Sequence, residues 1–281
     1  MAILKLALVQ MDSRDDVEAN LAQVVKYIKL AKQGGADIVA FPEFMNFLAF
    51  SRTNMYFEGV DGRTTRLLQS LAVDNDIIIQ AGSILIDSGS DRPYNQTFIV
   101  DRDGSLKGRY SKVHLFDGIA TGNTEFREST LYTPGNSIVV SEIMGVKVGT
   151  AICYDFRFPD LFRIMARAGA KIIFVPGNFT VHGGKHKLEA VMQTRAIENG
   201  VFIVSADQVG TKKKSESYGH SMVISPDGDI LAIKEEGEGL LFCEIDTLEV
   251  NRQRLRLPLL EHNREDVYEI YRKKLKDGPL K

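Results

Sequence analysis

Strand-like and helix-like runs alternate along the chain, and this alternation limits the possible folds more than any other feature. Residues 3–11 read as a buried strand, and apolar residues then recur at helical spacing from 17 onward until a Gly-Gly pair ends the run. Further strands are predicted over 37–44 and 76–86, with a helix over 64–73 between them. Elements that alternate in this way pack as sheets covered by helices, so we expect an α/β fold.

Three predicted turns divide the later β-rich segments into hairpins. Asp-Gly pairs at 103–104 and 227–228 are strong hairpin signals, and a Met-Gly pair at 144–145 allows a third. Pro159 suits the first turn of a helix. Another helix is predicted over about 185–199. These segments continue the α/β pattern through the second half of the chain.

Composition indicates a globular chain and narrows its partners. The 281 residues are 44% hydrophobic and 26% charged, and no break in composition marks a linker, so we expect one domain over 1–281. A net charge of −2 and a pI of about 6.2 favour neither nucleic acid nor an anionic membrane as a partner. The lysines at 212–214 are too few to change this and are expected in a solvated loop. No apolar run reaches the ~18 residues of a spanning helix, and the N-terminus resembles a strand more than a signal peptide.

The two cysteines, Cys153 and Cys243, occur in different settings. Neither belongs to a CxxC pair, so we expect free thiols and a reducing cytoplasm. Cys153 ends an apolar run just before the helix expected at Pro159. At such a junction amide dipoles can hold a thiolate, and the N–H of Tyr154 can face an oxyanion. A small buried hydrophobe is the alternative for Cys153, and it is our expectation for Cys243.

Glu43 and Lys112 also stand near the predicted ends of strands. Glu43 follows Pro42, where a carboxylate is well placed to act as a general base. Lys112 has apolar neighbours, and a buried lysine is costly unless a carboxylate pairs with it. Its ammonium could then stabilise a developing negative charge. Taken singly, either side chain could instead lie in solvent.

Other catalytic patterns are weaker. No serine, histidine and aspartate suggest a triad, and no glycine-rich run matches a P-loop or a dinucleotide fingerprint. His182 and His186 have the spacing of two metal ligands on a helix, but Gly183 and Gly184 weaken that helix and no third ligand is apparent. We therefore expect no metal and no cofactor.

Together, Glu43, Lys112 and Cys153 resemble the Glu-Lys-Cys set of the nitrilase superfamily. Their contexts are FPEF, YSKVHLFD and GTAICYDFRFPDLFR, and the resemblance continues through PGNF, QTRAIENG and GHSMVISPDG over nearly the whole chain. It implies a four-layer αββα sandwich. It also implies a homodimer or higher homo-oligomer, with the tail from about 258 contributing to subunit contacts.

The resemblance implies a role for each residue. Glu43 would deprotonate Cys153, whose thiolate would attack an amide carbon. Lys112 and the Tyr154 N–H would hold the oxyanion, and water would later hydrolyse the thioester. Glu128, in the motif FRES, matches an additional glutamate of the family that would orient Lys112.

Tyr154 and Asp155 follow the cysteine, where true nitrilases tend to carry Trp-Glu, and this resembles the amidase branch that includes ω-amidases and Nit proteins. A small linear amide that itself bears a carboxylate is therefore the expected substrate, with ammonia released. The loop 180–188 departs from the Thr-Gly and His-Trp pairs of those amidases. In it, Lys187, His182 or Lys185 would supply a cation for the carboxylate. The candidate substrate-binding residues are Asn178, Phe179, His182 and Lys187.

Three other functions stay open from the sequence. An N-carbamoyl amide hydrolase would use the same groups and release carbon dioxide as well as ammonia, and a nitrilase would act on a nitrile. A catalytically silent scaffold would share only the fold. A binding protein has no physical need to keep a nucleophile, a base and an oxyanion cation together, which argues against the scaffold.

Overall fold

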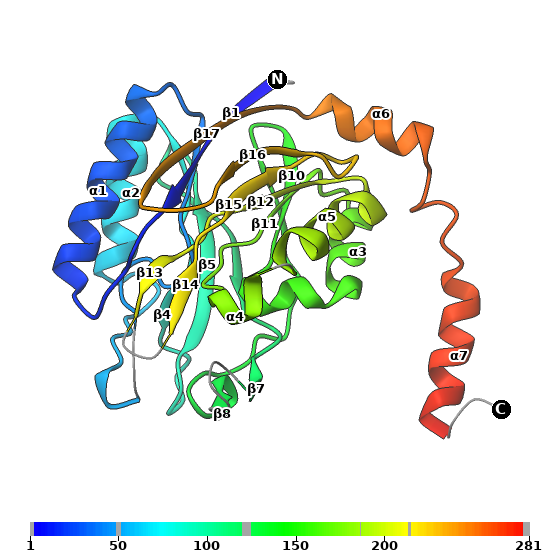
Figure 1. The fold of residues 1–281 in the computed structure, drawn as a ribbon, viewed down its shortest axis with the longest axis horizontal. Coiled ribbons are helices and arrows are strands. Elements are labelled where there is room, and N and C mark those ends of the chain that lie inside the picture. Colours follow the sequence, from blue (N-terminus) through cyan, green and yellow to red (C-terminus); the bar gives the residue numbers. More distant parts are fainter. Residues whose placement is uncertain (1–2, 49–51, 120–124, 186, 213–214, 278–281) are drawn as a thin grey trace.

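The structure is a computed structural model that describes residues 3–48, 52–119, 125–185, 187–212 and 215–277. Figure 1 shows two β-sheets packed against each other in the middle of the molecule, with helices on their outer sides. Helices, sheet, sheet and helices follow one another as four layers. The expected αββα sandwich is therefore confirmed.

The first sheet is mixed and is built mainly from the N-terminal half of the chain. Its strands are β1 (Ile3–Gln10), β2 (Ile38–Ala40), β3 (Ile78–Gln80), β4 (Ile84–Ile86), β5 (Tyr94–Val100), β6 (Leu106–Ser111) and β17 (Gly239–Asp246). They lie in the order β17-β1-β2-β3-β5-β4, and β6 pairs with β5. The strands β1, β2 and β3 are parallel, whereas β17 returns from the C-terminal part to pair antiparallel with β1.

The second sheet is built from the C-terminal half. Its strands are β9 (Val140–Ile143), β10 (Val146–Thr150), β11 (Ile172–Phe174), β12 (Phe202–Ser205), β15 (Ser221–Ile224) and β16 (Ile230–Lys234). They lie in the order β16-β15-β12-β11-β10-β9, with β10, β11 and β12 parallel. Two small hairpins lie apart from both sheets, β7 (Asp117–Ile119) with β8 (Glu125–Arg127), and β13 (Val209–Thr211) with β14 (Glu216–Tyr218).

Helices cover the outer faces of both sheets. Those over the first sheet are α1 (Val17–Gln33) and α2 (Arg63–Asn75), and those over the second are α3 (Pro159–Arg167) and α5 (Leu188–Asn199). The remaining helices are the single turn α4 (Val181–Gly184), and α6 (Leu248–Arg256) and α7 (Glu265–Asp277) near the C-terminus. None of the helices among the described residues is both long and apolar enough to cross a membrane.

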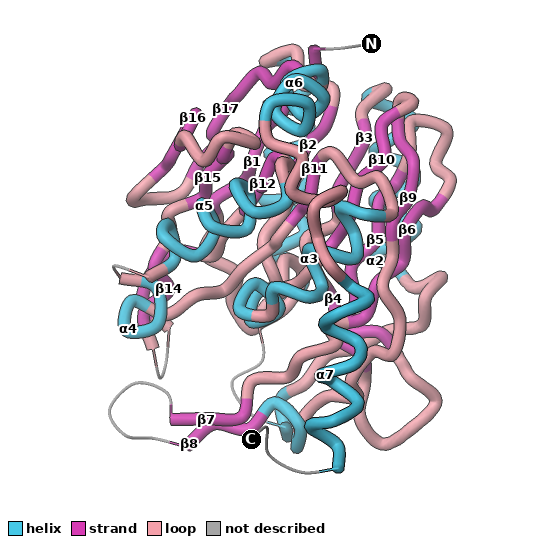
Figure 2. Tube along the Cα trace, turned by 90° about the vertical axis from the view of Figure 1, so that its right-hand side faces the viewer, coloured by secondary structure: helices cyan, strands magenta, loops and turns pink. Residues whose placement is uncertain are grey.

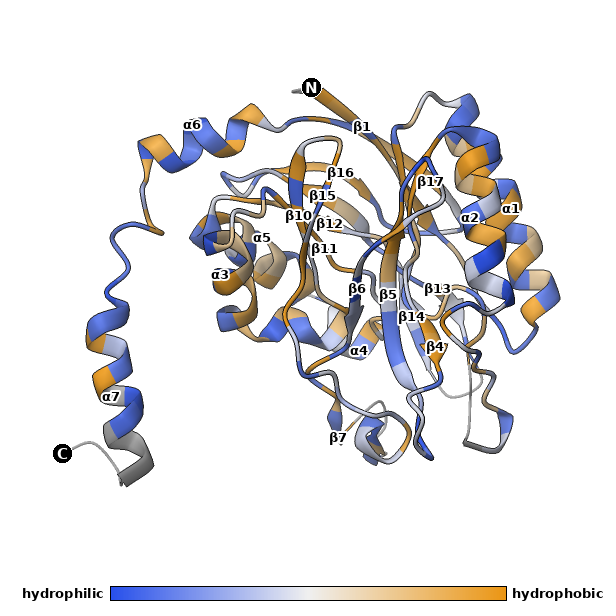
Figure 3. Ribbon diagram, turned by 180° about the vertical axis from the view of Figure 1, so that it is seen from behind, coloured by the Kyte–Doolittle hydropathy of each residue, from blue (hydrophilic) through white to orange (hydrophobic). Residues whose placement is uncertain are grey.

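The core has three layers of apolar side chains because successive residues of a strand point to opposite faces. In β1, Leu4, Leu6 and Leu8 belong to the cluster between the two sheets. Ala7 and Val9 point the other way and belong to the cluster under α1 and α2. A third cluster lies between the second sheet and its helices. Figure 3 shows the contrast between β1, largely hydrophobic, and α7, largely hydrophilic.

The three predicted hairpins are confirmed by antiparallel pairing of β5 with β6, β9 with β10 and β15 with β16. The single strand predicted over 76–86 is wrong, because it is divided into β3 and β4. Gly82 lies between them with φ of +57°, and a Cβ there would collide with the carbonyl oxygen of Pro42. Only glycine adopts this conformation at low cost, so the chain turns where the apolar pattern runs on.

The charged C-terminal tail contains a helix that the sequence analysis did not predict. Figure 1 shows α7 apart from the body of the molecule on the side of α3, and in Figure 2, where that side faces the viewer, α7 lies in front. Arg272 on α7 pairs with Asp160 on α3 at 3.1 Å, and Arg167 pairs with Glu265 at 3.5 Å. Tyr268 and Ile270 on α7 stay exposed. Two ion pairs therefore join α7 to α3 of its own chain.

Candidate active site

One cavity of about 760 Å³ collects the site residues expected from the sequence. Its lining includes Glu43, Lys112, Glu128, Cys153, Tyr154, Asn178, Phe179, His182 and Lys187. Lys185, the third candidate cation, is exposed and is not part of this lining. His186 lies outside the described residues.

Strand ends bring these residues together. Glu43 follows β2, Cys153 follows β10 and Asn178 follows β11. Residues that follow parallel strands gather at the edge where the carboxyl ends of those strands meet, which is where α/β folds place their sites. The predicted strand over 37–44 ends at Ala40 in the structure, so Glu43 lies on the loop beyond it. Phe44 has φ of +60°, a conformation that turns the chain directly after Glu43.

Lys112 lies between two carboxylates in the interior. Its Nζ is 3.1 Å from Oε1 of Glu43 and 2.9 Å from Oε1 of Glu128, and its side chain is only 1% exposed. The second oxygen of Glu128 accepts a hydrogen bond of 2.7 Å from the N–H of Phe116. Asn95 donates to Oε1 of Glu43 at 2.8 Å. The expected carboxylate partners of Lys112 are therefore present in the geometry.

The charges of this cluster depend on one another. Burial by itself disfavours the ammonium of Lys112, but the carboxylates of Glu128 and Glu43 outweigh it and hold the pKa of Lys112 well above its usual value. Burial raises the pKa of Glu128, and the attraction of Lys112 opposes this rise. The carboxylates thus favour the charged form of Lys112, which can attract a negative charge that forms on the substrate beside Cys153.

Cys153 begins a tight turn, the 3₁₀-helix Cys153–Arg157, which leads into α3. The residue itself has φ of +44°, a region that non-glycine residues rarely adopt. Its N–H donates to the carbonyl of Pro176 at 2.9 Å, which ties the turn to the end of β11. A strained residue of this kind persists only where surrounding contacts hold it, and such residues cluster at functional sites.

The hypothesis that amide dipoles hold Cys153 as a thiolate is wrong for the resting site. Burial raises the pKa of the Cys153 thiol and the charge of Glu43 raises it further, while Lys112 and the N–H of Asn178 lower it. The net result is a pKa well above the ordinary value. The thiol is neutral at rest, so it needs a base at the moment of attack.

The wall and the mouth of the cavity differ in character. Apolar and aromatic side chains form much of the wall: Phe44, Leu48, Phe116, Ile119, Phe126, Tyr132, Phe156 and Phe179. Exposed basic residues lie at the mouth, namely Arg157, His182 and Lys187. The guanidinium of Arg157 lies 4.6 Å from the centre of the Phe156 ring. Sequence reasoning gave Arg157 no role, although its place four residues after the cysteine in the same turn was a usable signal.

Lys212 corrects another expectation. Instead of lying in a solvated loop, it is buried at the cavity wall, where its ammonium contacts Asp12, the carbonyl of Ser13 and Oε1 of Gln208. Burial lowers the pKa of Lys212, and Asp12 opposes that shift. Residues 213 and 214 lie outside the described residues. The internal ion pair with Asp12, absent from any local pattern, is what allows this lysine to be buried.

Cys243 is a free cysteine, like Cys153, but it lies on β17. It is partly buried and packs against the cluster between the sheets, so the expectation of a core cysteine is met in part.

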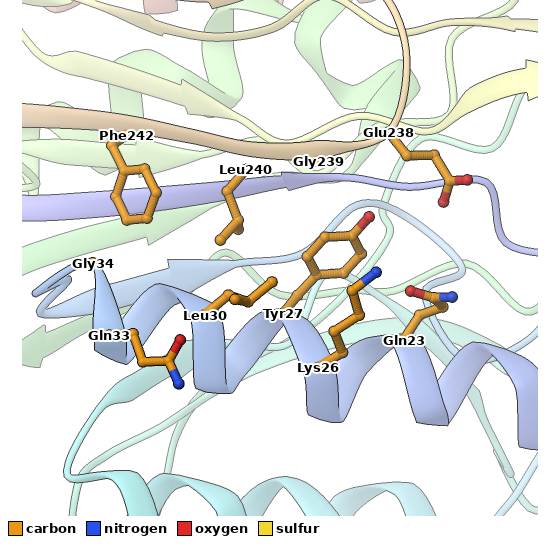
Figure 4. Close-up of a pocket in the computed structure, with 10 residues that line it drawn as sticks. All are labelled: Gln23, Lys26, Tyr27, Leu30, Gln33, Gly34, Glu238, Gly239, Leu240 and Phe242. Carbon is orange, nitrogen blue, oxygen red and sulfur yellow. The ribbon is translucent and has the colours of Figure 1, made fainter.

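A second hollow lies between α1 and β17, as Figure 4 shows. The side chains of Tyr27 and Leu30 on α1 face Leu240 and Phe242 on β17 across it. Lys26 and Glu238 are its charged residues. None of the predicted site residues lines this hollow. The cavity that holds Cys153 is therefore the candidate active site.

Residues 5–254 match the protein family described as carbon-nitrogen hydrolase. The chain is 34% identical over 277 residues to an ω-amidase, NIT2-A of Xenopus laevis, covering 98% of this chain and 100% of that protein. It is 34% identical over 266 residues to the deaminated glutathione amidase of Synechocystis, covering 91% and 96% of the two chains. The NitFhit protein of C. elegans has a similar structure, with a TM-score of 0.88 and 30% identity. That match covers 95% of this chain and 66% of the longer NitFhit chain.

Proposed function

This chain belongs to the carbon–nitrogen hydrolase family of the nitrilase superfamily, and from that premise we propose that it is an amidase that works through a thioester on Cys153. The observation that carries the proposal is the cluster beside the thiol. A buried ammonium, Lys112, is held between the carboxylates of Glu43 and Glu128 in the same cavity as Cys153. A nucleophile, a base and an oxyanion cation are what amide hydrolysis by a cysteine requires.

In the first half of the reaction, Glu43 takes the proton from the Cys153 thiol as sulfur attacks the amide carbon. A carbon–sulfur bond forms, and the carbonyl oxygen becomes an oxyanion that Lys112 and the N–H of Tyr154 stabilise. The proton held by Glu43 passes to the leaving nitrogen, the carbon–nitrogen bond breaks, and ammonia departs.

In the second half, Glu43 takes a proton from water, whose oxygen attacks the thioester carbon. The carbon–sulfur bond breaks, the sulfur regains a proton, and a carboxylic acid is released. A neutral resting thiol suits this sequence, because the burial that raises the pKa of Cys153 makes the base necessary. Glu128 holds Lys112 in place through both halves.

The basic mouth of the cavity supports an amide that itself carries a carboxylate. Arg157 and Lys187 are exposed at the mouth, whereas the amide carbon must reach Cys153 in the interior. A linear substrate would span this distance, with its amide inside and its carboxylate on a guanidinium or an ammonium. The names of the two curated relatives, an ω-amidase and a deaminated glutathione amidase, accord with such substrates.

The test is ammonia release from a panel of ω-amides, N-carbamoyl amino acids and short nitriles, run beside Cys153→Ala. Turnover of ω-amides by the wild type alone is the expected result. Turnover of carbamoyl compounds or nitriles instead would move the chain to another branch. If no compound is turned over and Cys153 is no more reactive than Cys243, the proposal that this chain is an enzyme would be contradicted.

We also propose a homodimer in a reducing compartment such as the cytoplasm. Two apolar residues are exposed on α7, Tyr268 and Ile270, and they support subunit contacts by the tail from about 258. Both cysteines are free, which suits reducing conditions. Light scattering should give twice the mass of 31.3 kDa for the chain. A mass of one chain at micromolar concentration would contradict the dimer.

A further inference from the structure

Asp155 lies two residues beyond Cys153, and its fully buried carboxylate has four polar contacts. Oδ2 accepts hydrogen bonds from the hydroxyl of Tyr110 at 2.7 Å and from the N–H of Ile152 at 2.9 Å. Oδ1 accepts from the N–H of His114 at 2.9 Å and lies 2.7 Å from Nδ1 of the same histidine. Both oxygens are therefore engaged, as is usual for a buried polar side chain.

The partners of Asp155 flank the two groups that react. Tyr110 and His114 stand two residues before and two residues after Lys112, and Ile152 directly precedes Cys153. One side chain thus joins the segment that carries the ammonium to the turn that carries the sulfur. These segments belong to different sheets, because β6 leads to Lys112 and β10 leads to Cys153.

We propose that Asp155 is a positioning residue that sets the separation between the ammonium of Lys112 and the sulfur of Cys153. The inference rests on the function proposed above and extends it to a side chain that touches neither the substrate nor the reacting atoms. It also gives the strained conformation of Cys153 a physical support, since the bond from Ile152 holds the turn immediately before it.

A carboxylate is needed because both of its oxygens accept hydrogen bonds. Oδ2 accepts from Tyr110 and Ile152, and Oδ1 accepts from the N–H of His114. Asparagine offers one carbonyl oxygen and one NH₂ group, so only one side can still accept. The NH₂ group would face either the N–H of His114 or the donors of Tyr110 and Ile152, and that side would separate. Asp155→Asn should therefore displace the lysine segment relative to the turn while leaving Glu43, Lys112 and Cys153 in the chain.

The experiment measures the rate of alkylation of Cys153 by iodoacetamide against pH, together with kcat and KM for the best amide of the panel. Asp155→Asn should lower kcat about 100-fold, the loss expected when a reacting group is misplaced by about 1 Å, with KM within about twofold. Its alkylation profile should move to higher pH, because the Lys112 charge that favours the thiolate is withdrawn. Tyr110→Phe, which removes one of the contacts, should act in the same direction by roughly threefold to tenfold.

Arg254→Met is the control for loss of stability. Arg254 holds the carbonyls of Gly200 and Ala170 from α6, away from the cavity. Its replacement should lower the thermal midpoint without moving kcat or the alkylation profile. A loss in Asp155→Asn no larger than that of Arg254→Met at a similar midpoint would show a merely structural role and overturn the inference.

The two proposals fail in different ways. If Cys153 of the wild type is alkylated no faster than Cys243, the proposed function itself fails. If the wild type is reactive but Asp155→Asn keeps its profile and kcat within twofold, only the positioning role is overturned. Should Asp155→Asn not fold, Tyr110→Phe decides, and an unchanged profile in that variant overturns the inference.

Discussion

The side-chain amide of Asn95 donates a 2.8 Å hydrogen bond to Oε1 of Glu43, the same oxygen that the ammonium of Lys112 contacts at 3.1 Å. Two donors on one oxygen fix the plane of the carboxylate. They leave Oε2 as the oxygen that can take a proton from Cys153 or from water. Asn95 is fully buried and comes from β5, where no catalytic pattern marks it in the sequence.

Asn95→Leu should lower kcat by about one to two orders of magnitude with little change in KM. The reason is the loss of a hydrogen bond to a charged group, worth about 1.5–3 kcal/mol, at the base rather than at the substrate. Steady-state kinetics on the best amide measures this. Asn95→Asp should be worse, since it sets a second carboxylate against Glu43. A tenfold rise in KM with unchanged kcat would mean that Asn95 acts on the substrate instead.

Glu43→Gln should separate the reactivity of the thiol from turnover. Hydrolysis should fall by about 10²–10⁴-fold, because the general base is lost. The pKa of Cys153 should fall, since the charge of Glu43 raises it and Lys112, which lowers it, remains. The alkylation profile with iodoacetamide should therefore move to lower pH. Glu142→Gln, at an exposed position on β9, is the matched control and should change neither quantity. Near-normal hydrolysis by Glu43→Gln would exclude Glu43 as the base.

Arg157→Met should raise KM by about tenfold or more for an amide that bears a carboxylate. KM should stay almost unchanged for an uncharged analogue in which that carboxylate is replaced by an ester or a methyl group. A charge-assisted hydrogen bond at the mouth would be lost only for the acidic substrate. Lys185→Met is the matched control, because Lys185 is also an exposed basic residue but does not line the cavity. Equal effects of Arg157→Met on both substrates would assign Arg157 a role in folding or packing.

Asp207→Asn should stabilise the protein at neutral pH by about 1 kcal/mol or more, because each unit by which burial raises the pKa of a carboxyl costs about 1.4 kcal/mol once the unfolded chain is ionised, and asparagine does not titrate. Asp207 is fully buried, and among the described residues its Oδ1 has no hydrogen-bond partner. Burial holds the pKa of Asp207 well above the 3.8 of an exposed aspartate. The folded chain therefore binds this proton more tightly than the unfolded chain does.

The sign of the pH dependence follows from that proton. The contribution of Asp207 to stability is fully present below the unfolded pKa and is lost as the pH rises toward the folded one. Asparagine does not titrate. The difference in the free energy of unfolding between Asp207→Asn and the wild type should therefore grow from pH 5 to pH 8 in urea titrations. A difference that shrinks over this range would mean that Asp207 is ionised in the folded chain.

Much of the fold could be predicted from the sequence because it depends on local patterns. An apolar run predicted β1, helical spacing predicted α1, and Asp-Gly pairs predicted the turns that the pairing of β5 with β6 and of β15 with β16 confirms. The divided strand at Gly82 escaped this reasoning, because the break depends on the close approach of Pro42, on the loop that follows β2. The helix α7 escaped it because its sequence is mostly charged.

The chemistry of the site could be predicted from the sequence, since a nucleophile, a base and a cation are properties of residue types near strand ends. The charges and the partners of these residues depend on the tertiary structure. Lys212 is buried against Asp12, and Asp155 contacts Tyr110 and His114, so each contact joins residues that lie far apart in the chain. The neutral state of the Cys153 thiol likewise depends on burial and on Glu43, which is distant in the chain. Burial and Coulombic attraction act through space, so no pattern along the chain contains them.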